Sequence, residues 1–235
     1  MICFAFPLAH EAELVLKHCT EKESFTVDDL RCTLGNLGQR RVLVALIGMG
    51  EERARINTEM LFERFRLKAF ILAGYGGALV PPLEVGHVVV SSNYSTDAVI
   101  GFLRMLSGFD FANFCQVNEV VGTVEGRAAC AKETGAQVAD MESEVVAAVV
   151  SSQQIPFLAV RVISDEFSQV LPTGALAAGF DPVRGKATPV RLLRYLALHP
   201  GEFAPFSQFV TGLTRARKNL TRFLEGINKE LPGSW

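Results

Sequence analysis

One stretch of the chain, residues 137–166, constrains the fold more than any other. Its last part, the run IPFLAVRVI at 155–163, is short, rich in β-branched residues and almost entirely apolar. Such a run is typical of a strand that is buried on both faces of a sheet. Arg161 interrupts it, and an unpaired charge inside a protein is costly. We therefore expect the Arg161 guanidinium to contact a carboxylate or a bound anion.

Acidic residues stand on both sides of this expected strand. Asp140 and Glu142 precede an apolar segment near Val145 that we interpret as the start of a helix, and Asp165 follows the strand. Ligands of open α/β sheets bind beyond the carboxyl ends of the strands, which allows Glu142 and Asp165 to face one cleft. The alternative is that Asp140 and Asp165 only cap a helix and a turn, where Asp is favoured. Spacing alone leaves both interpretations open.

Strands and helices alternate along the rest of the chain with short connections, which predicts an α/β fold with a mixed sheet. Residues 74–79 are expected to be a glycine-rich loop whose backbone approaches a ligand, and 167–188 a second loop. The Phe-rich stretch 93–118 has no clear periodicity. The expected strands are 2–6, 42–47, 69–73, 85–92, 117–124 and 136–139, with a hairpin arm over 25–37 and turns at Gly35-Asn36 and Gly38-Gln39. The expected helices run from Pro7 to about His18 and over 51–65, 126–133, 189–198 and 205–229.

Length and composition indicate one globular domain that spans residues 1–235. Apolar residues make up 49% of the chain and charged residues 20%, and neither a linker nor a repeat divides it. The net charge of −2 provides no basic surface for a nucleic acid. No apolar run reaches the ~20 residues that a membrane helix needs, and the first residues do not form a signal peptide.

The five cysteines are scattered, odd in number and without a CxxC pair. This pattern argues against a disulfide framework and against a structural zinc site. We expect reduced thiols in a cytoplasmic protein that uses no metal.

Two glycines, Gly48 and Gly50, separate an expected strand from an expected helix. The sequence GMGEER lacks the third glycine of a dinucleotide fingerprint and the Gly-Lys-Ser/Thr ending of a Walker loop. The pair is either a tight strand-to-helix turn or a set of backbone donors that holds phosphate or the nucleophilic water. Arg53 and Arg55, in the first turns of the helix, are expected to be solvated.

Several segments together resemble the nucleoside phosphorylase and nucleosidase superfamily. ADMESEVVA followed by FLAVRVISDE matches a DME segment and an R-x-I-S-D segment that its members share in this order. GMGEERARIN resembles the family's G-x-G-K-x-x-A turn and helix, and ILAGYGGALVPPLEVGHVVVSS resembles its G-x-A-G-G-L…G-D-x-V-x-S signature. The resemblance covers most of residues 2–166. It implies a three-layer α/β/α fold whose mixed central sheet closes partly into a barrel.

The resemblance also implies a chemistry, the cleavage of the N-glycosidic bond of a purine nucleoside. The departing base needs a proton and the sugar hydroxyls need acceptors, which carboxyl groups can supply. Asp165 would be the general acid to the purine, and Ser164 would orient it. Glu142 would accept hydrogen bonds from the ribose 2′- and 3′-hydroxyls, and Met141 would pack against the sugar.

The nucleophile needs a base on the opposite face of the sugar. The nucleosidases carry an acidic segment near the N-terminus whose last Glu activates water, and here that segment reads LAHEAEL. Glu11 is the expected base, with Glu13 as the alternative. We group Arg161 with the catalytic residues, and Tyr75 and Gly76 with the substrate-binding residues.

The resemblance leaves the attacking group open. Phosphorylases of the superfamily hold phosphate with an Arg and a Ser, where this chain has Leu72 and Tyr75, and the nucleosidases carry Ser-Ala where it has Tyr75-Gly76. The branch that matches best is the hopanoid-associated phosphorylases, which resemble TGAQVADMES, the Asp…Leu-Pro segment at 165–172 and a tail with Pro200 and A-R-x-x-L at 216–220. That branch implies release of adenine from an adenosyl-linked polyterpenoid, with inorganic phosphate as co-substrate and no metal or organic cofactor.

Two other functions stay open beside this one. The chain is alternatively a hydrolytic 5′-methylthioadenosine/S-adenosylhomocysteine-type nucleosidase, or a non-catalytic nucleoside-binding protein that keeps the fold. The Phe-rich stretch 102–114 either lines an apolar mouth beside the sugar's 5′ side, as a lipidic substrate would need, or packs in the core. Family members are commonly dimers or hexamers, so we expect a homodimer or a larger homo-oligomer.

Overall fold

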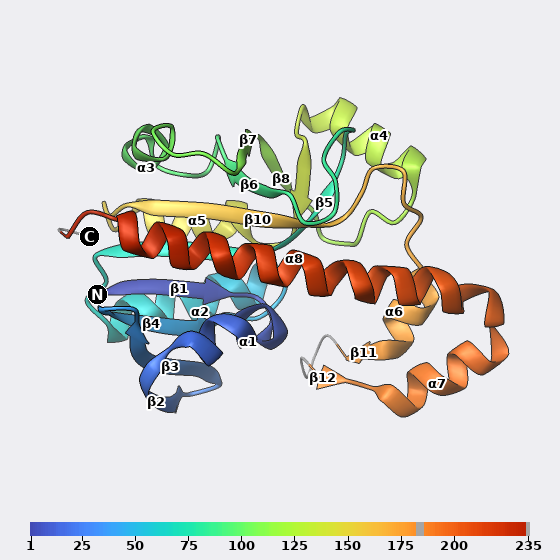
Figure 1. Ribbon diagram of the computed structural model, residues 1–235, viewed down its shortest axis with the longest axis horizontal. Helices are drawn as coiled ribbons and strands as arrows, with labels where there is room; N and C mark the ends of the chain where they lie inside the picture. The colour runs from blue at the N-terminus through green and yellow to red at the C-terminus, as the bar shows by residue number, and fades with distance from the viewer. Residues whose placement is uncertain (182–185, 234–235) are drawn as a thin grey trace.

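A mixed sheet of ten strands forms the centre of the computed structural model, which describes residues 1–181 and 186–233 (Figure 1). The strands follow the order β2-β3-β4-β1-β5-β10-β6-β7, and β9 joins the sheet between β5 and β8. They are β1 (Ile2–Phe6), β2 (Thr20–Val27), β3 (Leu30–Leu37), β4 (Arg40–Leu46), β5 (Ala69–Ala78), β6 (Val88–Ser91), β7 (Asp110–Ala112), β8 (Phe114–Gln116), β9 (Val138–Asp140) and β10 (Phe157–Asp165).

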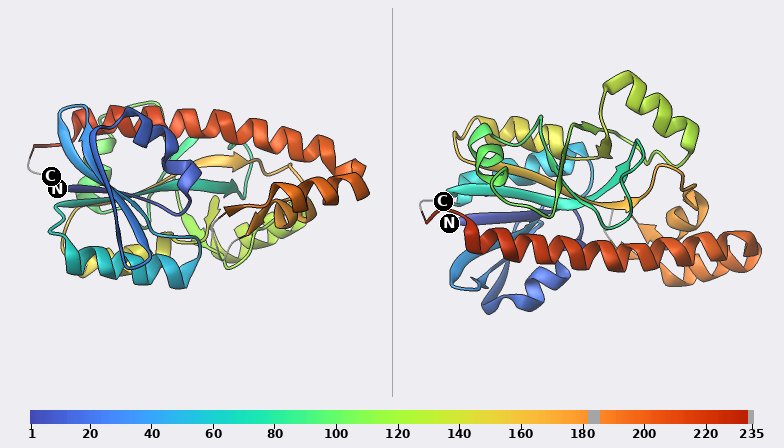
Figure 2. Two further views of the ribbon diagram at one scale, coloured as in Figure 1. Left: turned by 90° about the horizontal axis from the view of Figure 1, so that it is seen from below. Right: turned by 45° about the horizontal axis from the view of Figure 1, so that its top comes forward.

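Helices cover both faces of this sheet (Figure 2). In β1 the side chains of Phe4 and Phe6 pack on the side of α1 and α8, and those of Cys3 and Ala5 pack on the side of α2 and α5. This alternation follows from the two-residue period of a strand and explains why β1 and β10 are apolar on both faces. The helices are α1 (Ala9–His18), α2 (Glu51–Arg64), α3 (Asp97–Leu103), α4 (Val124–Thr134), α5 (Ser143–Ser151), α6 (Thr173–Gly179), α7 (Pro189–Leu198), η1 (Pro200–Glu202) and α8 (Phe203–Glu230).

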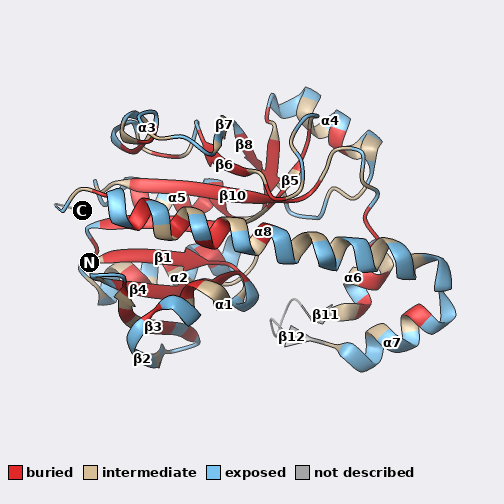
Figure 3. Ribbon diagram, in the orientation of Figure 1, coloured by how far each residue is buried: buried red, intermediate tan, exposed pale blue. Residues whose placement is uncertain are grey.

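The expected α/β class, with a mixed central sheet between helical layers, is confirmed. Burial concentrates in the sheet and on the inward sides of the helices, as Figure 3 shows. The four central strands β4, β1, β5 and β10 run parallel to one another, so their carboxyl ends meet at one edge of the sheet. That edge is where an α/β fold places its ligands.

The expected loop at residues 74–79 is wrong, because β5 continues through Ala78. Gly74, Tyr75 and Gly76 pair in register with Arg161, Val162 and Ile163 of β10. A Cβ on Gly76 would lie 2.8 Å from the Val138 side chain, closer than side chains approach one another. The glycines therefore let a paired strand lie tightly against its neighbours; they do not mark a turn.

Several other expected boundaries are also wrong. The hairpin arm begins at Thr20 and turns at Asp28-Asp29, while Gly35-Asn36 lie inside β3 and Gly38-Gln39 form the next turn. Residues 117–123 form a loop, not the expected strand, and α4 begins at Val124. The stretch 93–118 contains α3, β7 and β8, and 167–188 contains α6 and the pair β11 (Phe180–Asp181) and β12 (Lys186–Ala187), with 182–185 outside the described residues. These short elements are specified by their neighbours in space, which local sequence does not record.

The Phe-rich stretch packs against the core. Phe109 makes edge contacts with Phe111 and with Phe223 of α8, at ring-centre distances of 5.6 and 5.2 Å. Phe114 is buried, and Phe102 packs against the main core cluster. Phe102, Phe109 and Phe111 are only partly buried, so an apolar mouth that these rings line stays a prediction.

The C-terminal lobe, which comprises α6, α7, η1 and the first half of α8, projects beyond the carboxyl edge of the sheet (Figures 1 and 2). α7 packs on α6 and η1, and the second half of α8 returns along the sheet to pack on β10. Within residues 1–181 and 186–233, no helix is both long and apolar enough to cross a membrane.

Candidate active site

Arg161, in the middle of β10, is fully buried and bound by two carboxylates. Its Nε donates to Asp140 Oδ2 at 2.8 Å, and its Nη2 donates to Glu142 Oε2 at 3.1 Å. Asp140 ends β9, and Glu142 directly precedes α5. The expectation that Arg161 meets a carboxylate is confirmed.

Asp140 has two tasks. Beside its ion pair with Arg161, its Oδ1 accepts hydrogen bonds from the backbone N–H groups of Glu142 and Ser143, at 3.1 and 2.9 Å. These bonds satisfy donors at the start of α5, which helices leave without partners. The N-cap residue of α5 is Glu142, so Asp140 is not the N-cap, although its side chain accepts hydrogen bonds at the start of the helix.

Glu142 connects β10 to the glycine turn after β4. Its Oε1 accepts the Gly50 N–H at 2.9 Å, so the turn that contains Gly48 and Gly50 is tied to the Arg161 cluster. Burial raises the pKa of Glu142 to about 7, against the opposing charge of Arg161. A carboxyl group that titrates near neutrality can both accept and share protons.

Glu11 is the second acid in this neighbourhood, and it is only 2% exposed. Its Oε1 accepts the Tyr75 N–H at 2.8 Å, and its Oε2 accepts the Leu8 N–H at 2.7 Å. Burial raises the pKa of Glu11 to about 8, although Arg161 and the Tyr75 N–H act in the opposite direction. Glu13, the alternative, is half exposed and binds Lys17 and Arg217 at 2.7 and 2.5 Å. The geometry thus separates the two candidates.

Glu11 and Arg161 approach each other over Gly74. A Cβ on Gly74 would lie 2.7 Å from Arg161 Nη1 and 2.8 Å from Glu11 Oε1, so only glycine leaves room for both. Arg161 Nη1 is buried and has no hydrogen-bond partner in the described part of the chain. Such an unused buried donor is costly unless a ligand or water meets it. A donor and a carboxylate acceptor therefore face the same point.

Asp165, at the end of β10, is held from two sides. The Ser164 hydroxyl donates to its Oδ1, and Arg127 Nη2 donates to its Oδ2 at 2.6 Å. Burial raises the pKa of Asp165, while the Arg127 charge and the Ser164 hydrogen bond oppose that rise. Ser164 thus lies where the sequence predicts, in contact with the carboxyl group that it was expected to orient.

Arg127, on α4, is a site residue that sequence reasoning missed. It is fully buried, and besides Asp165 it binds backbone carbonyls of Val121 at 3.1 Å and Ala78 at 3.3 Å, and that of Glu166. It therefore ties the ends of β5 and β10 to the start of α4. Its segment, VEGRAACAKET, has no apolar stripe that would mark a buried position, so the sequence offers no signal for it.

The remaining predicted residues lie around these two clusters. Met141 is half-buried between β9 and α5, and the Tyr75 ring lies 5.2 Å from that of His10. The buried Tyr75 hydroxyl has no hydrogen-bond partner within the described residues. Gly76 accepts the Ser164 hydroxyl at its carbonyl, at 3.3 Å. Arg53 and Arg55 are exposed, as expected, and Arg55 pairs with Glu59.

Comparison with known sequences gives one family and a set of relatives. Residues 1–129 match the sequence model of the Phosphorylase superfamily. The 5′-methylthioadenosine/S-adenosylhomocysteine nucleosidase of Bacillus thuringiensis (strain Al Hakam) is 26% identical over 212 residues, which cover 72% of this chain and 90% of the relative. The nucleosidase of the same name from Staphylococcus aureus (strain JH9) is 24% identical over 202 residues, covering 70% and 86%.

Solved structures show the same fold. The Neisseria meningitidis 5′-methylthioadenosine/S-adenosylhomocysteine nucleosidase in complex with methylthio-immucillin-A superposes with a TM-score of 0.72 at 18% identity, over 98% of this chain and 99% of that one. The futalosine hydrolase of Helicobacter pylori strain 26695 superposes with a TM-score of 0.75 at 14% identity, over 98% and 97%. The fold expected from the sequence resemblance is therefore confirmed.

Proposed function

Because the chain belongs to the phosphorylase superfamily, we propose that it is an enzyme that hydrolyses the N-glycosidic bond of a purine nucleoside. The observation that carries the proposal is a set of three buried carboxyl groups along β10: Glu11 and Glu142 lie at Arg161 in the middle of this strand, and Asp165 ends it. Each is at most 6% exposed, and burial raises the pKa of each. Groups shifted in this way, from separate elements, are typical of catalytic sites.

Asp165 is the proposed general acid. When the bond between the sugar C1′ and the purine N9 breaks, the base leaves with the bonding electrons and needs a proton. Asp165 would donate that proton to N7 of the purine, since its burial favours the protonated form. Ser164 and Arg127 would hold its carboxyl group in position.

Glu142 is the proposed sugar-binding group. A carboxylate can accept two hydrogen bonds at once, as the ribose 2′- and 3′-hydroxyls require. Arg161 and the Gly50 N–H fix its two oxygens and so fix the orientation in which it meets the sugar. Met141, half-buried beside it, would pack against the ribose.

Glu11 and Arg161 are the proposed water site. A water molecule over Gly74 would accept from Arg161 Nη1, which lacks another partner among the described residues, and donate to Glu11 Oε1. As the water oxygen attacks C1′, its proton would pass to Glu11. The raised pKa of Glu11 makes it a stronger base once it is ionised. A nucleoside reaches these buried groups only when neighbouring side chains move aside.

Electrostatics favour water over phosphate as the attacking group. The Arg161 guanidinium is paired with Asp140 and Glu142, so its positive charge is compensated by these carboxylates and is not left to bind a phosphate dianion. The places of the phosphorylases' Arg and Ser hold Leu72, which is fully buried, and Tyr75. The relatives are named nucleosidases and a hydrolase, which supports the same alternative. Phosphorolysis of the hopanoid-associated type stays a prediction without such support.

The base is proposed to be adenine, because the sequence relatives are named for methylthioadenosine and adenosylhomocysteine. The test is to incubate the protein with adenosine and 5′-methylthioadenosine, with and without phosphate, and to identify the sugar product by mass. We expect free sugar at a rate that phosphate does not change. A sugar 1-phosphate that forms only with phosphate would contradict hydrolysis, and no adenine release under either condition would favour a non-catalytic binding protein. Asp165→Asn is the control for contaminating activity.

A further inference from the structure

The outer side of α7 is apolar although it faces solvent. Val190, Leu193 and Leu198 are 80%, 69% and 70% exposed. Residues three, four or eight positions apart lie near one another on a helix surface, so these three side chains share the outer side with Arg191 and Arg194. An exposed apolar cluster of this kind marks an interaction surface.

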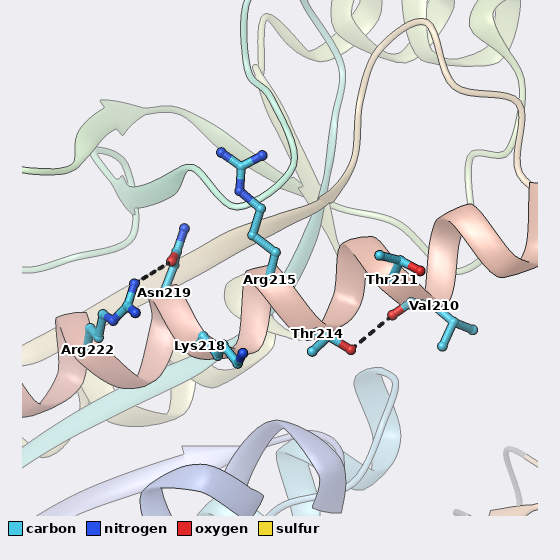
Figure 4. A pocket seen from close by; sticks show the side chains of 7 residues that line it. All are labelled: Val210, Thr211, Thr214, Arg215, Lys218, Asn219 and Arg222. Carbon is cyan, nitrogen blue, oxygen red and sulfur yellow. Dashed lines mark hydrogen bonds between the residues drawn. The ribbon is translucent and has the colours of Figure 1, made fainter.

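The start of α8 also exposes apolar side chains. Phe203 and Val210 are 63% and 44% exposed, and they lie on the outer side of the helix that leads to Lys218. The basic residues farther along α8 do not continue this apolar side: Arg215 lies five residues after Val210, about 140° around the helix, and its side chain lies beside Gly86. Figure 4 shows Arg215, Lys218 and Arg222 at a surface hollow of about 610 Å³ along α8, whose lining is completed by Val210, Thr211, Thr214 and Asn219.

The net charge of this region is positive, whereas that of the whole chain is negative. Residues 188–224 contain six Lys or Arg and one acidic residue, while the chain has a net charge of −2. The acid, Glu202, is engaged inside the lobe, where it accepts from the Tyr195 hydroxyl at 2.7 Å and the Ala175 N–H at 3.0 Å. The two cations of α7, Arg191 and Arg194, make no ion pair with another described residue.

We propose that this surface, the lobe face, binds the surface of an anionic lipid bilayer. The lobe face is formed by the exposed apolar side chains Val190, Leu193, Leu198 and Phe203 together with the α7 cations Arg191 and Arg194. Apolar side chains flanked by Arg and Lys insert at the boundary between acyl chains and headgroups, while the cations stay at the level of the anionic headgroups. Each cation near an anionic membrane adds to the attraction, and salt screens it.

A second copy of the chain fits this face less well. A symmetric contact would place the same residues of both copies opposite each other, so cations would meet cations. The only acid of residues 188–224 already has its hydrogen bonds within the lobe. An anionic membrane, in contrast, supplies the negative charge that the face lacks.

The geometry also gives the bound protein an orientation. The parallel strands point with their carboxyl ends toward the lobe, so a docked lobe brings that edge of the sheet to the membrane side (Figure 1). The inference itself does not depend on the proposed activity.

The test is flotation of the full chain with vesicles of equal parts phosphatidylcholine and phosphatidylglycerol, and with vesicles of phosphatidylcholine alone. We expect binding to the mixed vesicles, weak binding to the neutral ones, and loss of binding as salt is raised. Absence of binding to the mixed vesicles at low salt would overturn the proposal.

Two variants and a matched control sharpen the result. Leu193→Glu with Phe203→Glu removes the apolar contact, and Arg191→Gln with Arg194→Gln removes charge; each should lower the bound fraction at least several-fold. Met105→Glu, which changes an equally exposed apolar residue outside the lobe, should bind as the wild type does. Circular dichroism and adenosine turnover in the absence of vesicles check that each variant is folded. Equal binding by all variants would contradict the proposal, as would a dimer that Leu193→Glu with Phe203→Glu converts to monomer, because a second copy would then occupy the face.

Discussion

Two arginines are fully buried among residues 1–181 and 186–233, and they are bonded in different ways. Arg127 uses all its nitrogens: one carboxylate, that of Asp165, and three backbone carbonyls receive its hydrogen bonds. Arg161 binds two carboxylates and keeps Nη1 without a partner among the described residues, beside Glu11. Arg161 lies in the middle of β10, and Arg127 lies on α4.

This difference separates a structural clamp from a reactive site. A saturated arginine fixes the groups around it, and Arg127 thereby fixes the ends of β5 and β10 and the carboxyl group of Asp165. An arginine with an unused donor next to a carboxylate whose pKa is raised can bind and polarise a small molecule. The proposed water site therefore lies at Arg161, and Arg127 acts through Asp165.

The largest expected effect is on stability. Arg161→Met leaves Asp140 and Glu142 buried without their cation, which should lower the free energy of unfolding by ~3–5 kcal/mol. Arg127→Met removes the cation beside a single carboxyl group, that of Asp165. Because burial already favours the protonated form of Asp165, the decrease in the free energy of unfolding should be about half as large. Urea denaturation of both variants measures the difference. Arg55→Met, at an exposed i,i+4 pair, is the control and should cost about 0.5 kcal/mol. A larger decrease in the free energy of unfolding for Arg127→Met than for Arg161→Met would contradict this difference between the two arginines.

The next largest expected effect is on catalysis by Asp165, the carboxyl group that Arg127 holds in place. Asp165→Asn keeps an acceptor for Arg127 but cannot donate a proton to the purine, so kcat should fall about a hundred- to ten-thousand-fold. Calorimetric titration with a non-hydrolysable adenosine analogue should show little change in affinity. Wild-type turnover by this variant would remove Asp165 from the mechanism, and loss of affinity without a loss of turnover would assign it to binding alone.

A further effect is expected from pH. The folded-state pKa of Glu11 is about 8 against an ordinary value of 4.5, so the folded protein holds a proton that the unfolded chain releases. The stabilising contribution of that proton is complete below pH 4.5 and is lost as pH rises to about 8, and Glu142, at about 7, adds to the trend. Activity should rise over the same interval, because a general base must be ionised. Thermal melts and kcat/KM profiles should therefore slope in opposite directions. Parallel slopes would contradict the role of Glu11.

The burial of Arg161 and its contact with a carboxylate could be predicted from the sequence, and the burial of Arg127 could not. Arg161 interrupts an apolar run, so its burial and its need for a carboxylate follow from the cost of an unpaired charge. Arg127 lies in a helix of mixed composition, where an arginine is usually exposed. Only the packing of α4 against the ends of β5 and β10 buries it, and that contact joins residues far apart in the sequence.

The strands and helices also divide into those that could be predicted from the sequence and those that could not. Long apolar strands such as β1, β4 and β10 were predictable, because burial on both faces leaves a continuous pattern. β5 was predicted too short, since its glycines resemble a loop until the neighbouring Arg161 and Val138 side chains are seen. The short strands β7 and β8 and the helix α6 depend on contacts that no local pattern records.

Turnover of Glu11→Gln compared with Glu13→Gln tests the central claim most directly. The two acids are two residues apart on α1, but Glu11 is buried beside Arg161 and Glu13 binds Lys17 and Arg217 at the surface. With adenosine or 5′-methylthioadenosine as substrate, Glu11→Gln should lose about a hundred- to ten-thousand-fold in kcat, and Glu13→Gln should remain near the wild type. Wild-type turnover by Glu11→Gln, or an equal loss in Glu13→Gln, would contradict the assignment of the water site to Glu11 and Arg161.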